Sequence, residues 1–519
     1  MSGTPYCAFS YEAKAEICVD CSQGERSNTE WWLQGGFVIG SNDQKSNYQL
    51  TDRERALFVR YSALSLPRHT SYPAANYWRD CLAEEDYKSW LLEEISPLGP
   101  QRLGLYVHIP FCRSLCHYCG CTGEVITDGK RSIYDPSGEY LKALARERHS
   151  YANLGPGITS DILVDKIHLG GGTPTFLNPD QLLKLWDALG VSFHRHSHHQ
   201  WEIDPAAELA AEIDPRVTSR QHLEVLWEIG FRRLSFGIQD FNREVQRKIN
   251  RIQPLEMVQS CVEEARSVGF QQINFDLIYG LPLQTVQTIE ETLATVVSLK
   301  PSRIAFYRLA VMPEIFKWQK SFTRQDLPAG FETLDMMLMA VQVFRKFNYQ
   351  FIGFDHFALP DDPLWADYLS RRLVRNFQGM TTGGSSLTIG MGPSAISSGQ
   401  GFYAQNFRTR AAWMRALELT RPTARGIKLS PEEQKRRALI LDLYCYGEIN
   451  RGDFQLSHIE RRRLNTLCDE GLLIADSQKY RTTFLGQLLT RVIGSALDPY
   501  LPGEAWSEGL RPGLSSAAG

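Results

Sequence analysis

Four cysteines stand within ten residues of one stretch, HIPFCRSLCHYCGC. Cys112, Cys116 and Cys119 follow the spacing C-x3-C-x2-C, and Cys121 comes two residues later. Thiols this close together can form a disulfide, ligate zinc or hold an iron–sulfur cluster. Structural zinc normally takes two separated pairs of ligands, whereas a short loop can wrap three thiolates around one small cluster. The spacing favours a cluster. Zinc held by the three thiolates with His117 or Cys121 is the alternative.

A cluster held by three cysteines has a chemical consequence. Cubanes usually have four cysteine ligands, so one with three leaves an iron open to bind another molecule. Cys121 is then one ligand too many. A disulfide is disfavoured because the 11 cysteines are odd in number and unevenly spaced, and the N-terminal residues lack a secretory signal. These features suit a reducing, cytoplasmic environment.

The bulk composition excludes several classes of function. The 519-residue chain is 43% hydrophobic and 22% charged, with a formal net charge of -3. Because it has no basic excess and no Lys/Arg block, general binding to nucleic acid or anionic membranes is disfavoured. Its longest apolar runs are shorter than the roughly 18 residues of a membrane span. We therefore expect no nucleic-acid partner, no membrane span and a cytoplasmic location.

The pattern of elements changes at Leu103, where short β-rich runs begin to alternate with amphipathic helical segments. The expected strands are residues 103–109, 165–171, 208–214, 232–239, 272–280 and 302–311. The expected helices between them are residues 139–152, 180–189, 220–230 and 256–269. Repeated βα units imply a parallel sheet of about six strands with right-handed crossovers. The sequence predicts an α/β protein built on a partial (β/α)6 TIM-like barrel.

Other segments are expected to surround this barrel. The predicted order is a poorly ordered extension (1–50), an N-terminal arm over the substrate cleft (51–100), the barrel (101–350), barrel-completing and cavity segments (351–430), a mainly helical C-terminal domain (431–505) and a disordered tail (506–519). Two further groups of possible metal ligands, the histidines of HRHSHH and the cysteines Cys7, Cys18 and Cys21, lie in polar sequence and are interpreted as unliganded.

Five polar or glycine-rich motifs fall at the carboxyl ends of the expected strands: HIPFC, GGGTP, EIDP, GIQD and DLIYGLP. In a parallel barrel these ends form one face, and that face carries the chemistry. GGGTP provides backbone without side chains, which a ligand can approach closely. The five motifs are therefore expected to converge on one mouth.

These motifs carry a resemblance. The cysteine spacing, with an aromatic Tyr118 before Cys119, resembles the signature of radical S-adenosylmethionine (SAM) enzymes. Together LPRHTSYP, YVHIPFC, GGGTPTFL, EIDPR, RLSFGIQDFNREVQRKINR, NFDLIYGLP, DHFALPDD, RNFQGMTT and GMGPSAIS resemble the oxygen-independent coproporphyrinogen III oxidase family from about residue 55 to about residue 500. The Cys-Gly-Cys ending and PR-x-TSYP are the more specific parts.

The resemblance implies cofactors and their residues. One [4Fe–4S] cluster is expected on Cys112, Cys116 and Cys119, with its open iron binding SAM. A first SAM is expected at Tyr106, Gly171, Glu212 and Ile396. A second SAM is expected at Tyr118, Gly172, Thr173, Gln239, Arg251, Asp276 and Ala310. The second EIDP copy, with Glu212, is chosen because its spacing to RLSFGIQ fits the family. A carboxylate suits a ribose diol or an ammonium group, and an arginine fork suits the SAM carboxylate.

The resemblance also implies a reaction. The catalytic residues are expected to be Tyr106, Glu212, Arg68 and Gln378, with Arg68 pairing with a substrate propionate. The reaction is the anaerobic oxidative decarboxylation of two propionates of coproporphyrinogen III to vinyl groups, giving protoporphyrinogen IX in haem biosynthesis through a 5′-deoxyadenosyl radical. The expected partner is a low-potential electron donor such as flavodoxin or ferredoxin, and the chain is expected to be a monomer.

Two alternatives on the same scaffold remain. One is a radical SAM methyltransferase, either haem-degrading or cyclopropane-forming. The stretch FYRLAVMP supports this alternative because it departs from the oxidase family pattern. The other is a haem-binding chaperone without catalysis. PR-x-TSYP and Cys-Gly-Cys favour the oxidase over both.

Overall fold

The computed structural model describes residues 50–62, 64, 66, 70–95, 101–127, 129, 134–152, 162–193, 201–419, 422–452 and 454–501. Several features singled out in the sequence lie outside these residues. They are the N-terminal stretch up to residue 49 with Cys7, Cys18 and Cys21, the tail predicted for 506–519, Arg68, and the histidines of residues 194–199.

Six parallel strands form the centre of the fold and are adjacent in chain order. They are β2 (Gln101–Ile109), β5 (Ile162–Gly171), β7 (Trp201–Ile213), β8 (Arg233–Gln239), β9 (Gln272–Tyr279) and β10 (Arg303–Arg308). Each corresponds to one of the strands expected from the sequence, so the partial (β/α)6 barrel is confirmed. The sheet remains open, because further strands continue it beyond both β2 and β10.

The strands that extend the sheet come mostly from the second half of the chain. Beyond β2 they are β15 (Leu387–Met391), β16 (Ile396–Ser398), β17 (Phe402–Asn406), β18 (Thr423–Lys428) and β1 (Arg79–Asp80). Beyond β10 they are β12 (His356–Ala358) and β11 (Gln350–Ile352). Only β15 continues the parallel order; the pairings of the others are antiparallel. The short strand β6 (Val191–Ser192) pairs with β7, and β13 (Val374–Asn376) and β14 (Gly379–Thr381) form a separate two-stranded sheet.

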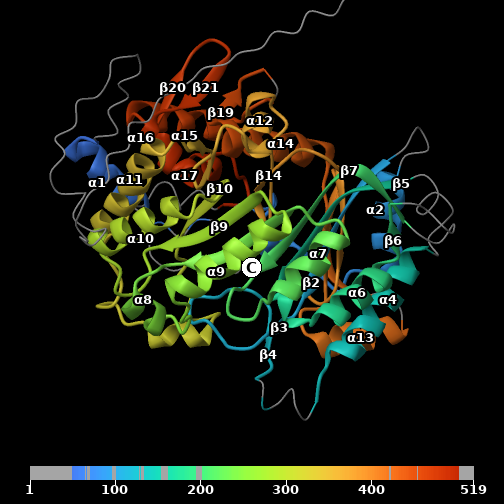
Figure 1. Cartoon of the computed structure of the whole chain (residues 1–519). Helices are drawn as coiled ribbons and strands as arrows, with labels where there is room; N and C mark the ends of the chain where they lie inside the picture. Colours follow the sequence, from blue (N-terminus) through green and yellow to red (C-terminus); the bar gives the residue numbers. More distant parts are fainter. Residues whose placement is uncertain are drawn as a thin grey trace, which may run out of the picture. The chain divides into compact units, whose positions relative to one another are not determined.

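Helices cover the outer face of the parallel strands (Figure 1). They are α4 (Ser137–Ala152), α6 (Pro179–Leu189), α7 (Arg220–Glu228), α8 (Arg243–Lys248), α9 (Leu255–Val268), α10 (Val286–Ser298) and α11 (Gly330–Lys346). Their ends are set by local sequence. For example, Asn178 and Gln181 form a capping box at the start of α6, and Gly190 ends that helix at a φ of 58°. The apolar faces of these helices bury the main hydrophobic core against the sheet.

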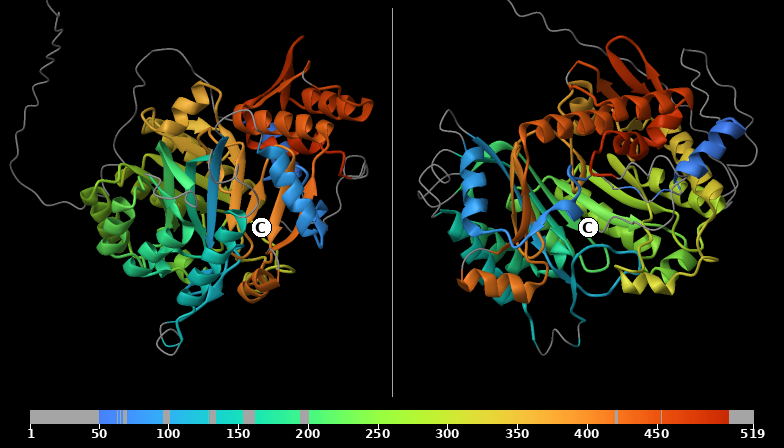
Figure 2. Two further views of the ribbon diagram at one scale, coloured as in Figure 1. Left: turned by 90° about the vertical axis from the view of Figure 1, so that its right-hand side faces the viewer. Right: turned by 180° about the vertical axis from the view of Figure 1, so that it is seen from behind.

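The C-terminal segment combines helices with a small sheet (Figure 2). Its elements are α14 (Pro431–Tyr446), β19 (Glu448–Asn450), α15 (His458–Asp469), β20 (Leu473–Ala475), β21 (Lys479–Thr482), α16 (Phe484–Leu488) and α17 (Thr490–Ala496). The antiparallel sheet β19–β21–β20 was not expected from the sequence. A second core packs this segment against α1 (Asp52–Ser62) and α11. The remaining helices are α2 (Glu84–Glu94), α12 (Pro363–Leu369) and α13 (Arg410–Leu419).

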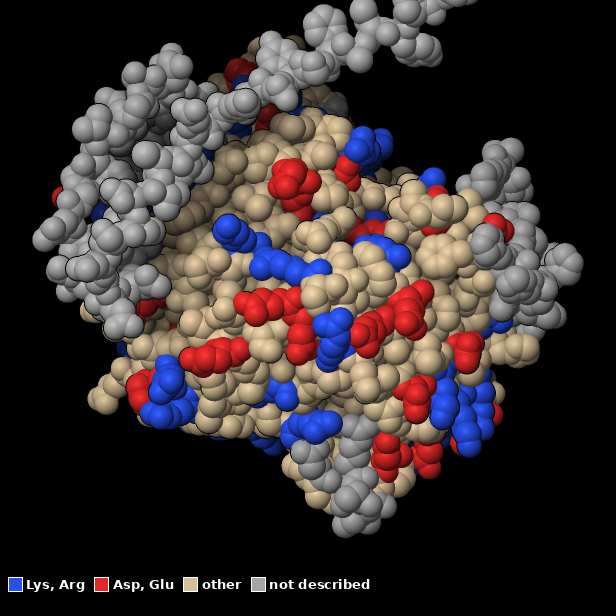
Figure 3. Space-filling view, viewed as in Figure 1, with Lys and Arg blue, Asp and Glu red and all other residues tan. Residues whose placement is uncertain are grey.

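The surface agrees with the near-neutral charge. On the face shown in Figure 3, acidic and basic side chains are interspersed rather than gathered into one basic area. Within the described ranges, none of the helices combines the length and the apolar character that crossing a membrane requires.

Candidate active site

The cysteine loop follows the carboxyl end of β2. Cys112 ends the short strand β3 (Phe111–Cys112), which pairs with β4 (Glu124–Val125) and closes the loop. The loop is fastened to the residues after α8: the His117 amide donates to Ile249 O at 2.8 Å, and Asn250 Nδ2 donates to Leu115 O at 2.8 Å. Two elements far apart in the sequence therefore hold the loop in place.

The sulfurs of the loop receive hydrogen bonds from the protein. Thr173 Oγ1 donates to Cys112 Sγ at 3.7 Å, and the Cys121 amide donates to Cys119 Sγ at 3.4 Å. Such donors stabilise cysteine ligands as thiolates and tune an iron–sulfur cluster. With the donors to Cys116 described next, each of the three sulfurs has at least one. The donor set fits a cluster held by these three residues. In the described part of the chain, no three His, Cys, Asp or Glu side chains could hold a single metal ion.

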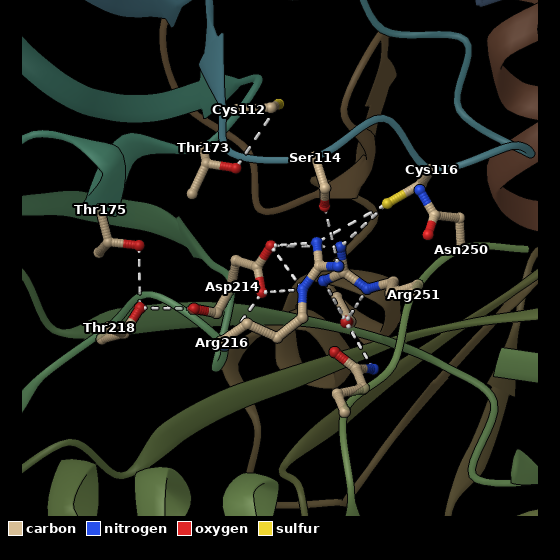
Figure 4. Close-up of polar contacts among 12 residues, drawn as sticks. Cys112, Ser114, Cys116, Thr173, Thr175, Asp214, Arg216, Thr218, Asn250 and Arg251 are labelled. Atoms are coloured by element: carbon tan, nitrogen blue, oxygen red, sulfur yellow. Dashed lines mark hydrogen bonds and ion pairs between the residues drawn. The ribbon is translucent and has the colours of Figure 1, made fainter. Parts of the chain in front are cut away.

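Cys116 adjoins a network of two arginines and one carboxylate (Figure 4). Arg216 Nη2 and Arg251 Nη1 each donate to Cys116 Sγ at 3.7 Å. The same nitrogens donate to Asp214 Oδ2 at 2.7 and 3.3 Å, and Arg216 Nη1 donates to Ser114 Oγ at 3.2 Å. Burial alone would raise the pKa of Asp214, but Arg251 and Arg216 together lower it to about 2. The network therefore places a net positive charge beside Cys116.

The glycines of GGGTP lie where side chains cannot fit. A Cβ on Gly172 would come within 2.7 Å of Phe111 O and 3.0 Å of Cys112 Sγ. A Cβ on Gly170 would lie 2.6 Å from Glu212 Oε1. Gly171 has a φ of 109°, which also favours glycine. This backbone can thus approach both the cysteine loop and a ligand closely, as the sequence predicts.

Glu212 joins the glycine turn to the first predicted SAM site. Its Oε2 accepts a hydrogen bond from the Gly171 amide at 3.2 Å, and its Oε1 lies 3.2 Å from His168 Nε2. The His168 ring stacks on Tyr106 with the ring centres 5.9 Å apart. Tyr106 in turn contacts His108 through its hydroxyl, 3.1 Å from Nδ1. Tyr106, Gly171 and Glu212 therefore form one contiguous group.

Arg251, Gln239 and Asp276 line the neighbouring strand ends. Arg251 Nη2 donates to Gly237 O at 2.6 Å, and Gln239 adjoins the same glycine. Gln239 has a φ of 69° at a register shift in β8, a conformation that is costly for a residue other than glycine and typical of functional sites. Burial raises the pKa of Asp276, although its carboxylate accepts a hydrogen bond from Ser235 Oγ at 2.8 Å.

A cavity within the barrel brings three predicted residues together. Glu212, Asp276 and Gln378 all line it, and Tyr307 and His356 contribute to the same wall. Gln378 comes from the turn between β13 and β14, so the second half of the chain closes a space that the barrel strands begin.

The remaining predicted residues surround this mouth. Gln319 Nε2 donates to the carbonyls of both Tyr118 (3.3 Å) and Ala310 (3.0 Å), which ties the cysteine loop to the end of β10. Ile396 packs against a small apolar cluster that includes Trp78 of the N-terminal arm. Arg68 lies outside the described residues. The roles assigned to all these residues remain predictions.

Sequence reasoning missed several polar residues of this region. Asp214 and Arg216 were only parts of the motif EIDPR and were not selected as site residues. Ser235 and Asn274 were not selected. Because alternate residues of a strand share a face, counting back by two from Asp276 would have found Asn274. Ser235 is the partner of Asn274 on β8, and the register shift at Gln239 interrupts the same count there.

Comparisons with known proteins agree with this geometry. Residues 106–296 match the radical SAM superfamily. The chain is 36% identical over 459 residues to the oxygen-independent coproporphyrinogen III oxidase of Helicobacter pylori strain J99, covering 86% of this chain and 97% of the relative. It is 37% identical over 463 residues to that of Escherichia coli K12, with 87% and 96% covered. The solved structure of coproporphyrinogen III oxidase from Escherichia coli, described as a radical SAM enzyme, superposes with a TM-score of 0.76 at 35% identity, covering 84% of this chain and 98% of the other. This chain belongs to the oxygen-independent coproporphyrinogen III oxidase family of radical SAM enzymes.

Proposed function

We propose that this protein converts coproporphyrinogen III to protoporphyrinogen IX without oxygen, in haem biosynthesis. The observation that carries the proposal is the coincidence of two findings. Nearly the whole length of the named relatives aligns with this chain. Glu212 and Asp276 line one cavity with Gln378, and the glycine turn that contacts Glu212 also adjoins Cys112.

The proposed reaction balances for each propionate arm. The β-carbon loses one hydrogen atom, the carboxylate leaves as carbon dioxide, and one electron passes to an external one-electron acceptor, so that a vinyl group remains. When bound, the cluster and SAM supply the 5′-deoxyadenosyl radical that takes the hydrogen atom. The protein contributes binding, orientation and exclusion of water, while the cofactor provides the reactive species.

The residues of the site have distinct proposed roles. Cys112, Cys116 and Cys119 hold the cluster. The backbone of Gly171 is proposed to contact the first SAM. Glu212 is proposed to accept hydrogen bonds from the ribose hydroxyls or the ammonium group of that SAM, with Tyr106 and Ile396 beside it. The second SAM is proposed to contact Tyr118, Gly172, Thr173, Gln239, Arg251, Asp276 and Ala310. Gln378 and Arg68 are proposed to face the substrate.

We also propose an electron donor, a cellular location and an oligomeric state. A flavodoxin or ferredoxin would deliver electrons, and the protein would act as a cytoplasmic monomer. The electron donor is proposed because a radical SAM cluster must be reduced before each cleavage.

The test is anaerobic product analysis. Protein reconstituted with iron and sulfide, chemically reduced, and incubated with coproporphyrinogen III and SAM should give the divinyl product, with loss of two carbon dioxide molecules seen by mass. Formation of 5′-deoxyadenosine without vinyl groups would contradict the proposal. Transfer of a labelled SAM methyl group into the product would instead identify a methyltransferase.

A further inference from the structure

The cavity described above has a second end. Besides Glu212 and Asp276 it is lined by Arg233 and Arg303, which are the first residues of β8 and β10. Because parallel strands all start at the end of the sheet opposite the cysteine loop, these two arginines form the deep end of the cavity. We call this end the floor. None of the predicted SAM or cluster residues belongs to it.

The floor arginines have hydrogen-bond donors without protein partners. Arg303 is 2% exposed; its Nε donates to Asp362 Oδ1 at 2.9 Å and its Nη2 lies 2.7 Å from the same oxygen. Its Nη1 is buried and has no partner among the described residues. Arg233, 8% exposed, donates from Nη2 to Glu208 Oε1 at 2.8 Å, but its buried Nε has no partner in the described part of the chain. An unpaired buried donor on a charged group is costly, so these atoms call for an acceptor in the cavity.

Both floor arginines interact with more than one carboxylate. Arg233 pairs with Glu208, and Arg303 pairs with Asp362 and also interacts with Glu208 and Asp367. Burial would raise the pKa of Glu208, but Arg233, Arg303 and Lys166 lower it well below its ordinary value, so Glu208 stays ionised. The unpaired donors of Arg303 and Arg233, rather than an excess of charge, therefore call for a further acceptor.

We propose that the floor binds one carboxylate group of the substrate, through Arg303 and Arg233. The inference rests on the proposed function, since that function supplies a tetrapyrrole with propionate arms. Guanidinium groups bind carboxylates through paired, charge-assisted hydrogen bonds, and a propionate arm is slender enough to enter between strands where a ring cannot. One arm is thereby anchored below the reacting centre.

The two ends of the cavity then serve opposite charges. Glu212 and Asp276 at the mouth suit the cationic or hydroxyl groups of SAM, whereas the floor suits an anion. A third unpartnered buried atom, Asn274 Oδ1, is an acceptor. A substrate carboxylate only accepts hydrogen bonds and cannot pair with this oxygen. We therefore assign a bridging water as the donor to Asn274 Oδ1.

The test compares two ligands that differ only in charge. Coproporphyrin III, the stable oxidised form with the same four propionates, and its neutral tetramethyl ester are titrated into full-length protein by fluorescence. In the double variant Arg303→Gln with Asp362→Asn, both partners become neutral, so no unpaired charge is buried. The proposal expects binding of the acid to weaken by about tenfold or more while binding of the ester changes by less than about twofold. Equal weakening of both ligands, or no weakening of either, would overturn it.

A matched control is available in the C-terminal segment. Arg436 is 6% exposed and paired with buried Glu460 and with Leu497 O at 2.9 Å, yet it does not line the cavity. Arg436→Gln with Glu460→Gln should lower stability without changing the ratio of acid to ester affinity. A changed ratio would show that the effect of the floor variant is indirect.

A measurement on the unmodified chain avoids any folding defect. Free propionate should compete with coproporphyrin III, and propionamide, which has the same shape without the charge, should not. Equal competition by both, or by neither, would contradict a carboxylate site. The outcome is separable from the proposed reaction: vinyl formation without floor dependence rejects only the floor site, and charge-selective binding without vinyl formation rejects only the reaction.

Discussion

Two pairs of arginines lie at opposite ends of the parallel sheet, and their hydrogen bonds differ. At the cysteine end, Arg216 and Arg251 share one carboxylate, Asp214. At the floor, Arg233 and Arg303 each have a carboxylate of their own, on Glu208 and Asp362. Both pairs are buried or nearly so, which makes every unsatisfied donor expensive.

The difference lies in where the remaining donors point. At the cysteine end each guanidinium nitrogen has a protein partner, because Cys116, Ser114 and Gly237 O take the donors that Asp214 leaves. At the floor, Arg303 Nη1 and Arg233 Nε have none among the described residues. The same residue type therefore acts as a scaffold at one end and as a receptor at the other. Saturation of the donors, rather than charge, distinguishes the two roles.

The largest effect should come from removing the sulfur that the first pair contacts. Cys116→Ala should lose the cluster and reduce product formation by on the order of 10³-fold or more, because the remaining two thiolates cannot hold it. Iron content and the visible absorption of the reconstituted protein check this. Cys121→Ala is the matched control and should keep both. Full iron content in Cys116→Ala would contradict the assignment of Cys116 as a cluster ligand.

Removing the carboxylates should separate the two ends. Asp214→Asn and Asp362→Asn each leave buried guanidinium charge uncompensated and should each lower the free energy of unfolding by about 3–5 kcal/mol in urea titrations. Only Asp214→Asn should also lower the iron content, because only Asp214 orients donors to Cys116. Equal iron loss in both variants would break the comparison.

The shared carboxylate should also give a pH signature. The pKa of Asp214 is lowered from 3.8 to about 2, so its stabilising contribution is complete well above pH 3.8 and is lost as the pH falls towards 2. Relative to Asp214→Asn, the cluster-free protein should lose about 1 kcal/mol of this stabilisation between pH 5 and pH 3, and about 2 kcal/mol by pH 2. Urea titrations at these pH values measure it. A gap that does not change with pH would show that Asp214 is not held ionised by its arginines.

The parallel half of this architecture could be predicted from the sequence. Strands such as β9 are rich in β-branched, aromatic and other apolar residues and are bounded by turn residues. The glycines and cysteines after the strands mark the functional end directly. The strands from residue 350 onward could not be predicted, because β11, β12 and β16 are only three residues long and carry no readable period. Their pairing is decided by the edges of the existing sheet.

The floor pair shows a second limit. Arg233 and Arg303 are 70 positions apart, and each alone resembles an ordinary surface arginine at the start of a strand. Only the register of β8, β9 and β10 turns both inward. The pair at the cysteine end was within reach, since Arg216 follows EIDP and Arg251 was predicted, but their shared carboxylate depends on the fold.

The smallest effect should come from weakening the scaffold without removing its charge. Arg216→Lys keeps a cation beside Asp214. Because an ammonium group lacks the planar fork of a guanidinium, it cannot donate hydrogen bonds to Asp214, Ser114 and Cys116 at the same time. Unfolding free energy should fall by about 1–2 kcal/mol. With one donor to Cys116 weakened, the cluster should become harder to reduce, since hydrogen bonds to cluster sulfurs raise the reduction potential. Spectroelectrochemical titration measures this independently of turnover. Arg220→Lys, an exposed arginine paired with Glu224, is the control and should change neither quantity. An unchanged reduction potential in Arg216→Lys would mean that this guanidinium stabilises the loop without affecting the electronic properties of the cluster.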